Sequence, residues 1–314
     1  MKSLRLRTLF LLGFIASPNF YAQDLKVNSH GLDIHFRVFG QGEPLLIVGG
    51  GPGDVSDRYL SLCELLGKKA RCILVDQRGT GKSKPAVLDA STITVALTLD
   101  DFEAVRQQLG LKQWSVLGFS YGGYLASVYA HFFPASVSSL VLLGSIGLNF
   151  EGLGQFMDNV TSRLCASDRE LVEYWSDPGR MKADPQHATT EFIRARMAGY
   201  FFDRKKSLRI SQTMKSSDFD FAMGDCIFKD IIGRKLDLAK MESAFAGPAL
   251  IIHGRQDPSG ESAPLALKHY YKNSKLVFVE KCGHYSWIEQ PEKVLDAVGA
   301  FLSPEKTIAS GDTR

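Results

Sequence analysis

The sequence has no strong excess of either charge. Its 37 lysines and arginines nearly balance 34 aspartates and glutamates, which leaves a formal net charge of +3 at pH 7. Lys2, Arg5 and Arg7 are the only charges in the first 22 residues, so removal of that segment would leave a net charge of zero. Such a chain lacks the basic surface by which proteins bind nucleic acid or an anionic membrane, and we expect neither partner.

The apolar stretch at the N-terminus is too short to cross a membrane. It spans only about ten residues, whereas a transmembrane helix needs about 20. A basic start precedes it and small or turn-forming residues follow it, which is the pattern of a secretory signal peptide. We therefore expect residues 1–22 to be a leader, cut near Ala22 or Gln23, and the mature protein to be periplasmic or secreted. A retained N-terminal anchor is the alternative.

The five cysteines have no metal-site spacing. There is no Cys-x-x-Cys pair and no nearby pair of histidines, so we expect no metal. In the oxidising compartment that a leader implies, two disulfides are possible. Our expected pairs are Cys165 with Cys226 and Cys63 with Cys72, although sequence does not fix the pairing. Cys282 would then be a buried free thiol near the site.

Apolar runs that alternate with helical patterns predict an α/β fold, with a mostly parallel sheet and helices on both faces. Residues 24–40 alternate apolar and polar side chains, which predicts an edge hairpin with Gly31 in its turn. A strand is expected directly before Ser120, and further buried strands are expected at residues 45–48, 72–75, 137–143, 247–253 and 275–279. Helices are expected after Ser120 and at residues 57–69, 93–110, 262–273 and 287–302.

The pattern changes between two of these strands. Residues 148–246 are rich in charge and helical spacing and contain no clear strand. Because this segment is too long for a plain connection, we expect a helical cap over the carboxyl edge of the sheet. The core would then comprise residues 23–147 and 247–302, and residues 303–314 would form a C-terminal tail.

A candidate nucleophile lies between a predicted strand and a predicted helix. Gly118, Ser120 and Gly122 have the Gly-x-Ser-x-Gly spacing, which suits a serine held in a strained turn with its hydroxyl above the sheet edge. The helix that follows points its N-terminus at the serine. Its Tyr121 N–H can therefore meet a developing negative charge, as one half of an oxyanion hole.

The glycine-rich loop at residues 49–53 is a candidate for the other half. It follows the buried strand at residues 45–48, which is where the second oxyanion donor arises in folds of this kind. We expect the donor to be the N–H of Gly51, with Gly50 as its neighbour and alternative. A phosphate-binding loop is the rival interpretation, but the Gly-Lys-Ser/Thr ending is absent.

Serine needs a base to become nucleophilic at neutral pH. Of the seven histidines, only His284 lies in a loop at the carboxyl end of a strand with a glycine before it. His253 is the nearest competitor, and we expect it to pack beneath a loop. Asp257, at the end of the preceding strand, is expected to orient the base. Asp76 and Arg78 are expected to pair with each other and hold their loop.

Five motifs together resemble the α/β-hydrolase superfamily, and more closely its prolyl iminopeptidase-like branch. They are Gly-Gly-Pro-Gly at 50–53, Asp-Gln-Arg-Gly-Thr-Gly-Lys-Ser at 76–83, Gly-Phe-Ser-Tyr-Gly-Gly at 118–123, Gly-Arg-Gln-Asp at 254–257 and Gly-His at 283–284. The resemblance spans about residues 30–302. It implies a serine hydrolase that needs no cofactor, with Ser120 as nucleophile, His284 as base and Asp257 as its partner.

The chain also departs from that branch. Gly49 stands where a histidine is usual, and Ala198 aligns at or near a glutamate that holds the substrate's free amino group in the iminopeptidases. An ammonium site needs carboxylates in a partly desolvated pocket. The candidates to replace that glutamate are Glu191, Asp203 and Asp225.

The predicted function is therefore hydrolysis through an acyl-enzyme, with a small molecule or short peptide as substrate. An aminopeptidase of prolyl iminopeptidase type is one form of it, and a carboxylesterase for small or apolar acyl groups is the alternative. A non-catalytic binding protein on the same scaffold would be expected to lack a triad member, and none is missing. Aromatic residues of the predicted cap suit apolar groups, although such residues more often form a cap's own core: Tyr200, Phe201, Phe202, Phe219 and Phe221. The oligomeric state stays open.

Overall fold

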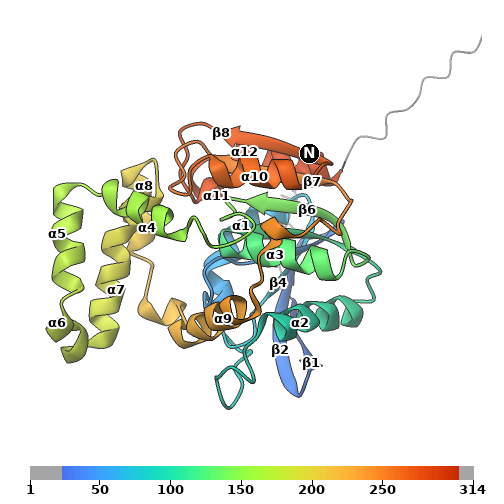
Figure 1. Cartoon of the computed structure of the whole chain (residues 1–314), viewed down its shortest axis with the longest axis horizontal. Helices are drawn as coiled ribbons and strands as arrows, with labels where there is room; N and C mark the ends of the chain where they lie inside the picture. The colour runs from blue at the N-terminus through green and yellow to red at the C-terminus, as the bar shows by residue number, and fades with distance from the viewer. Residues whose placement is uncertain (1–22, 304–314) are drawn as a thin grey trace, which may run out of the picture.

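The computed structural model describes residues 23–303. The predicted leader at residues 1–22, and all but the first residue of the predicted tail, lie outside this range and stay predictions. An eight-stranded sheet forms the centre, in the order β1-β2-β4-β3-β5-β6-β7-β8 (Figure 1). Within residues 23–303, no helix is both long enough and apolar enough to span a membrane.

The sheet is mostly parallel, as predicted. Its one antiparallel part is at the edge, where β1 and β2 form the expected hairpin around Gly31 and β2 pairs antiparallel with β4. Strands β3 to β7 are almost wholly buried, which explains why their sequences are continuous apolar runs. The strands are β1 (Gln23–Ser29), β2 (Leu32–Phe39), β3 (Pro44–Val48), β4 (Arg71–Val75), β5 (Trp114–Phe119), β6 (Val137–Leu143), β7 (Ala249–Gly254) and β8 (Ser274–Val279).

Helices cover both faces of the sheet. One apolar cluster contains side chains of α2, α3 and α10, and a second cluster contains side chains of α1, α11 and α12. The helix expected at residues 287–302 is two helices, because Pro291 cannot donate to a preceding turn and instead begins α12. These elements are η1 (Ser56–Tyr59), α1 (Leu60–Leu66), α2 (Val95–Gln108), α3 (Tyr121–Phe132), α10 (Ser262–Tyr270), α11 (Ser286–Glu289) and α12 (Pro291–Leu302).

Between β6 and β7 the chain is helical, and we call residues 148–246 the cap. In Figure 1, α5, α6 and α7 project to one side of the sheet. Helix α9 differs, because its Met223, Ile227 and Ile231 belong to the core cluster of α2 and α3. The elements are α4 (Leu153–Ser162), α5 (Ala166–Trp175), α6 (Pro178–Ala183), α7 (Pro185–Arg196), η2 (Met197–Tyr200), α8 (Arg204–Ser211), η3 (Ser216–Asp218), α9 (Phe221–Arg234) and η4 (Leu238–Lys240).

The disulfide predictions are wrong, because all five cysteines are free thiols in the structure. Cys63 and Cys72 are both buried and lie next to each other without a bond. The hydrogen bond with Cys72, together with burial, raises the pKa of the Cys63 thiol well above its usual range, which keeps it in the unreactive protonated form. Cys165 precedes α5 whereas Cys226 lies on α9, and these helices are well separated (Figure 1). Cys282 is a buried free thiol, as expected.

Candidate active site

Ser120 lies in a strained turn between β5 and α3. Its φ of 54° and ψ of −121° fall in a region that residues other than glycine rarely adopt. The turn depends on the two flanking glycines. A Cβ on Gly118 would collide with the Gly122 carbonyl, and a Cβ on Gly122 would collide with the carbonyl of Val48 in β3. The sequence spacing therefore reflects close backbone packing beneath the serine.

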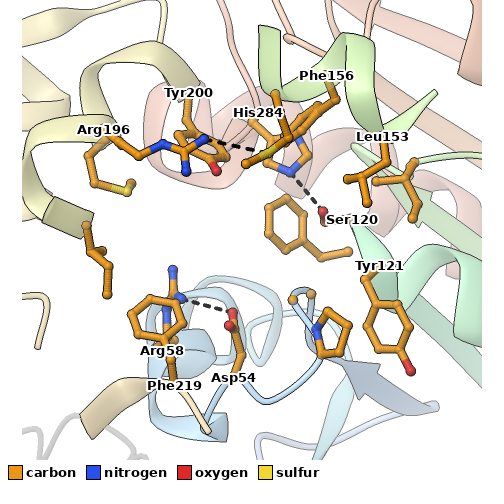
Figure 2. A pocket seen from close by; sticks show the side chains of 18 of the residues that line it. Asp54, Arg58, Ser120, Tyr121, Leu153, Phe156, Arg196, Tyr200, Phe219 and His284 are labelled. Atoms are coloured by element: carbon orange, nitrogen blue, oxygen red, sulfur yellow. Dashed lines mark hydrogen bonds and ion pairs between the residues drawn. The ribbon is translucent and has the colours of Figure 1, made fainter. Parts of the chain in front are cut away.

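Ser120, His284 and Asp257 form a chain of hydrogen bonds. The Oγ atom of Ser120 lies 3.0 Å from Nε2 of His284, as the dashed line in Figure 2 shows. On the other side of the ring, Nδ1 of His284 lies 2.7 Å from Oδ2 of Asp257. The histidine and the aspartate are buried, whereas the serine is partly exposed. The structure thus brings together the three residues that the sequence singled out.

The environment of Asp257 keeps its carboxyl ionised. Burial by itself raises the pKa of this carboxyl, but the imidazoles of His284 and His253 and the hydrogen bonds from His284 and Ser259 outweigh it, so that the pKa lies well below its usual range. Ser259 donates to Oδ1 from both its N–H, at 2.8 Å, and its hydroxyl, at 2.6 Å. His253 is buried beside Ser259, as expected for a residue packed beneath the loop. An anionic Asp257 can stabilise an imidazolium at His284.

The glycine-rich loop passes directly beside the serine. A Cβ on Gly50 would lie 2.8 Å from the Cβ of Ser120, so only glycine fits there. The Tyr59 hydroxyl lies 2.8 Å from the Gly50 carbonyl and can donate to it. Gly51 follows with a φ of +62°, and both glycines line the same cavity as Tyr121. The two backbone segments expected to supply oxyanion donors therefore flank Ser120.

The predicted pairing of Asp76 with Arg78 is wrong. Arg78 instead binds Asp101 of α2 with two hydrogen bonds of 2.6 and 2.9 Å. Asp76 contacts Nδ1 of His35 at 2.9 Å and accepts a hydrogen bond from Ser56. Each of the two side chains therefore finds its partner on another element, and together they join the loop after β4 to its neighbours.

A cavity of about 300 Å³ opens over Ser120 (Figure 2). Its walls come from both the core and the cap and are mainly apolar, with Tyr121, Phe150, Leu153, Phe156, Met157 and Tyr200 among them. Of the cap aromatics noted in the sequence, Phe219 and Phe221 also line it. Phe201 stacks instead on Tyr285, at 5.1 Å between ring centroids, and Phe202 is exposed. The shape and lining suit a small molecule with an apolar part.

Two charged residues that the sequence did not single out form an ion pair in the cavity wall. Nη1 of Arg58 lies 3.0 Å from Oδ2 of Asp54, and their side chains are only 11% and 8% exposed. Burial raises the pKa of Asp54 to about 6, although Arg58 and the Tyr59 hydroxyl act against it. The spacing of four residues suits a pair on one helical turn. Nothing in the neighbouring sequence, however, indicates that both side chains line the cavity over Ser120.

The three carboxylates proposed from sequence for an ammonium site do not line this cavity. Glu191 forms an ion pair of 2.7 Å with Arg194, one turn along α7. Asp203 accepts hydrogen bonds from two N–H groups in the first turn of α8, as a helix cap. Asp225 is exposed on α9. Glu191 and Asp203 are thus engaged by local partners, and that prediction is wrong.

Glu289 joins the loop of His284 to the cap. Its carboxylate accepts hydrogen bonds from the N–H groups of Gly283 at 2.6 Å, Asp203 at 2.7 Å and Phe202 at 3.3 Å. The N–H of His284 itself donates to the Tyr200 carbonyl at 2.8 Å. Nothing in the local sequence around Glu289 indicates this role, because two of its three donors lie more than 80 residues away.

Comparisons with known proteins agree with this fold. A sequence model of the alpha/beta hydrolase fold matches residues 43–291. The proline iminopeptidase of Heyndrickxia coagulans is 26% identical over 280 residues, covering 86% of this chain and 95% of that protein. The AB hydrolase superfamily protein YisY of Bacillus subtilis is 28% identical over 282 residues, covering 88% and 97%.

Solved structures show the same architecture. The proline iminopeptidase of Mycobacterium smegmatis superposes with a TM-score of 0.68 at 19% identity, covering 90% of this chain and 98% of that one. A serine hydrolase of Cycloclasticus zankles gives a TM-score of 0.67 at 17% identity, with the same coverage. At these identities the likeness shows the fold alone, whereas the family match extends over most of the chain. The chain therefore belongs to the α/β-hydrolase fold family and is an enzyme of the serine-hydrolase type.

Proposed function

We propose that this enzyme cleaves carboxylic esters or amides through an acyl-enzyme on Ser120. The observation that carries the proposal is the hydrogen-bonded chain from Ser120 through His284 to Asp257. His284 accepts the hydroxyl proton as Ser120 Oγ attacks the acyl carbonyl, and then gives that proton to the leaving group. Asp257 stays anionic and stabilises the imidazolium between these transfers.

Water completes the cycle. It loses a proton to Nε2 of His284 and attacks the acyl-enzyme carbonyl. The bond to Ser120 Oγ then breaks, His284 returns the proton to the serine, and the acid leaves. We assign the N–H groups of Gly51 and Tyr121 to the oxyanion in both steps, with Gly50 as the alternative to Gly51. Removing one such donor typically lowers kcat by about 100-fold to 1,000-fold.

The cavity favours an ester with an apolar acyl group. Its lining is largely aromatic and aliphatic, and Asp54 is the one Asp or Glu side chain among the described lining residues. An aminopeptidase of prolyl iminopeptidase type is the second candidate, and relatives such as that of Heyndrickxia coagulans support it. A substrate ammonium would need an available carboxylate, and Asp54 is already paired with Arg58.

Two measurements test this proposal. A serine-directed fluorophosphonate should label the wild type and leave Ser120→Ala unlabelled, which separates an enzyme from a binding protein. Hydrolysis of a short-chain ester reporter should fall by about 10⁴-fold or more in Ser120→Ala. A proline amide reporter assayed in parallel decides between the candidates, because serine-dependent cleavage of the amide alone would favour the aminopeptidase. Equal activity of Ser120→Ala and wild type on both reporters would refute the proposal.

A further inference from the structure

One cation in the cavity has no counter-charge. Besides His284, the charged or titratable groups of its lining include Asp54, Arg58 and Arg196. Asp54 and Arg58 neutralise each other as an ion pair. Across residues 23–303, no carboxylate lies within ion-pair distance of Arg196. With His284 neutral, the residues that line the cavity therefore carry one net positive charge whenever Asp54 is ionised.

The contacts of Arg196 are with soft, apolar groups. Its Nη2 lies 3.6 Å from the sulfur of Met157, and its Cζ lies 5.3 Å from the centroid of the Phe192 ring. Two other arginines of the cap are paired, Arg194 with Glu191 and Arg204 with Asp168. Arg196 is partly exposed, so its unpaired guanidinium is accessible to an anion that enters the cavity.

Arg196 lies on one side of the cavity. It lies at the C-terminal end of α7, and Figure 2 shows its side chain reaching toward His284 from the cap. In the same view, Arg58 lies on this side, whereas Tyr121 and Leu153 lie on the other side of Ser120. The two halves of an ester bound at Ser120 would therefore meet different surroundings. One half meets Tyr121 and Leu153. The other half, which we call the cationic half, meets Arg196 together with the Arg58–Asp54 pair, Phe219 and Tyr200.

We propose that the substrate of this site carries a carboxylate, which Arg196 binds in the cationic half of the cavity. This inference rests on the serine-hydrolase function proposed above and names its substrate class. The planar guanidinium presents a fork of N–H donors that matches a carboxylate. One unpaired positive charge matches one negative charge, whereas a phosphate monoester would bring a second charge of about −0.5 to −1 without a partner. Hydrolysis of such an ester consumes one water and releases an alcohol and an acid, one of which bears the additional carboxylate.

Two pairs of esters test this, each comparing a carboxylate with the carboxamide of the same shape. Phenyl hydrogen adipate with phenyl adipamate places the charge on the acyl side. The second pair, 4-carboxyphenyl hexanoate with 4-carbamoylphenyl hexanoate, places it on the alcohol side. We expect the wild type to prefer the acidic member of one pair by about 10-fold to 100-fold in kcat/KM, as for a hydrogen bond to a charged group.

Arg196→Gln should lose that preference, mainly through a higher KM, while Arg194→Gln should keep it. Arg194 is the matched control, because it lies two residues before Arg196 on α7 and pairs with Glu191 outside the cavity. Absence of a preference in both pairs, or a preference that survives in Arg196→Gln, would overturn the inference. Cleavage of the neutral esters alone would leave the serine-hydrolase function intact.

A binding measurement makes the test independent of turnover. Adipamate, which carries the acyl-side carboxylate, and 4-hydroxybenzoate, which carries the alcohol-side carboxylate, are titrated into the wild type, Arg196→Gln and Arg194→Gln by calorimetry. At least one acid should bind the wild type and the Arg194 variant about 10-fold more tightly than Arg196→Gln. If no acid distinguishes Arg196→Gln from the other two proteins, the carboxylate site does not exist, whatever the esterase assays show.

Discussion

The carboxylate of Glu289 accepts a 2.6 Å hydrogen bond from the N–H of Gly283, the residue before His284. The same buried carboxylate accepts the N–H groups of Asp203 and Phe202 from the cap. Three donors converge on one anion, which fixes the backbone that presents the His284 imidazole to Ser120. Under the proposed mechanism, Glu289 is therefore a positioning residue for His284.

Replacing Glu289 by glutamine should lower kcat by about 10-fold and change KM by less than about twofold. The amide has one oxygen and a donor NH₂ that would face other donors, so a loss of about 1.5–3 kcal/mol in the free energy of unfolding is also expected. Glu292→Gln, an exposed change on α12, is the control. If urea unfolding shifts while kcat is unchanged, Glu289 is structural only.

Gly50→Ala should abolish most activity. The added Cβ would lie 2.8 Å from both the Cβ of Ser120 and the carbonyl oxygen of Phe119, so the loop or the nucleophile must move. We expect kcat/KM to fall by at least about 100-fold, since displacements of about 1 Å at a catalytic group have effects of that size. Gly233→Ala on α9 meets nothing within 4 Å and should leave activity unchanged. Equal activity of both variants would contradict the close approach.

The ionisation of Asp54 makes stability depend on pH. Its pKa is about 6 when folded, above the ordinary value of 3.8, so the folded state binds more protons between these values. The contribution of Asp54 to stability is thus greatest below about pH 4 and falls by roughly 3 kcal/mol as the pH rises to about 6. Asp54→Asn lacks this dependence. The difference in unfolding free energy between wild type and Asp54→Asn, measured in urea from pH 4 to 7, should change in that direction, and a constant difference would contradict it.

Removing one partner of the buried Arg78–Asp101 pair should destabilise the fold strongly, whereas replacing both residues by apolar ones should destabilise it less. Both side chains are almost inaccessible to solvent. Asp101→Asn leaves the buried guanidinium of Arg78 without a counter-charge, and we expect a loss of about 3–5 kcal/mol in the free energy of unfolding. The double change Arg78→Met with Asp101→Leu should cost clearly less. Asp100→Asn, at the neighbouring exposed aspartate, is the control. A double variant as unstable as Asp101→Asn would contradict this account.

The features that sequence predicted are those that local pattern determines. Buried parallel strands appear as apolar runs, and Ser120 is marked by two glycines that its turn requires. His284 and Asp257 could be chosen because each follows a strand, and parallel strands bring their carboxyl ends to one edge.

The features that sequence missed depend on partners from distant elements. Arg78 reaches Asp101, 23 residues away, instead of the nearby Asp76, because the loop directs the two side chains to different neighbours. The orientation of Arg196 into the cavity, and the distant donors of Glu289, become visible only when the cap is placed on the core. Glu191 and Asp203 were plausible by charge alone, yet local ion pairing and helix capping account for both.

The hydrogen bond from the His284 N–H to the Tyr200 carbonyl has a consequence for engineering. A Cβ on Gly283 would collide with that same carbonyl, so the two segments are in direct backbone contact. The cap is consequently not an exchangeable module, because a graft that replaces residues 148–246 also removes part of the support for the base. Exchange of the cap to change substrate specificity should succeed only when residues 200–203 are retained with the core.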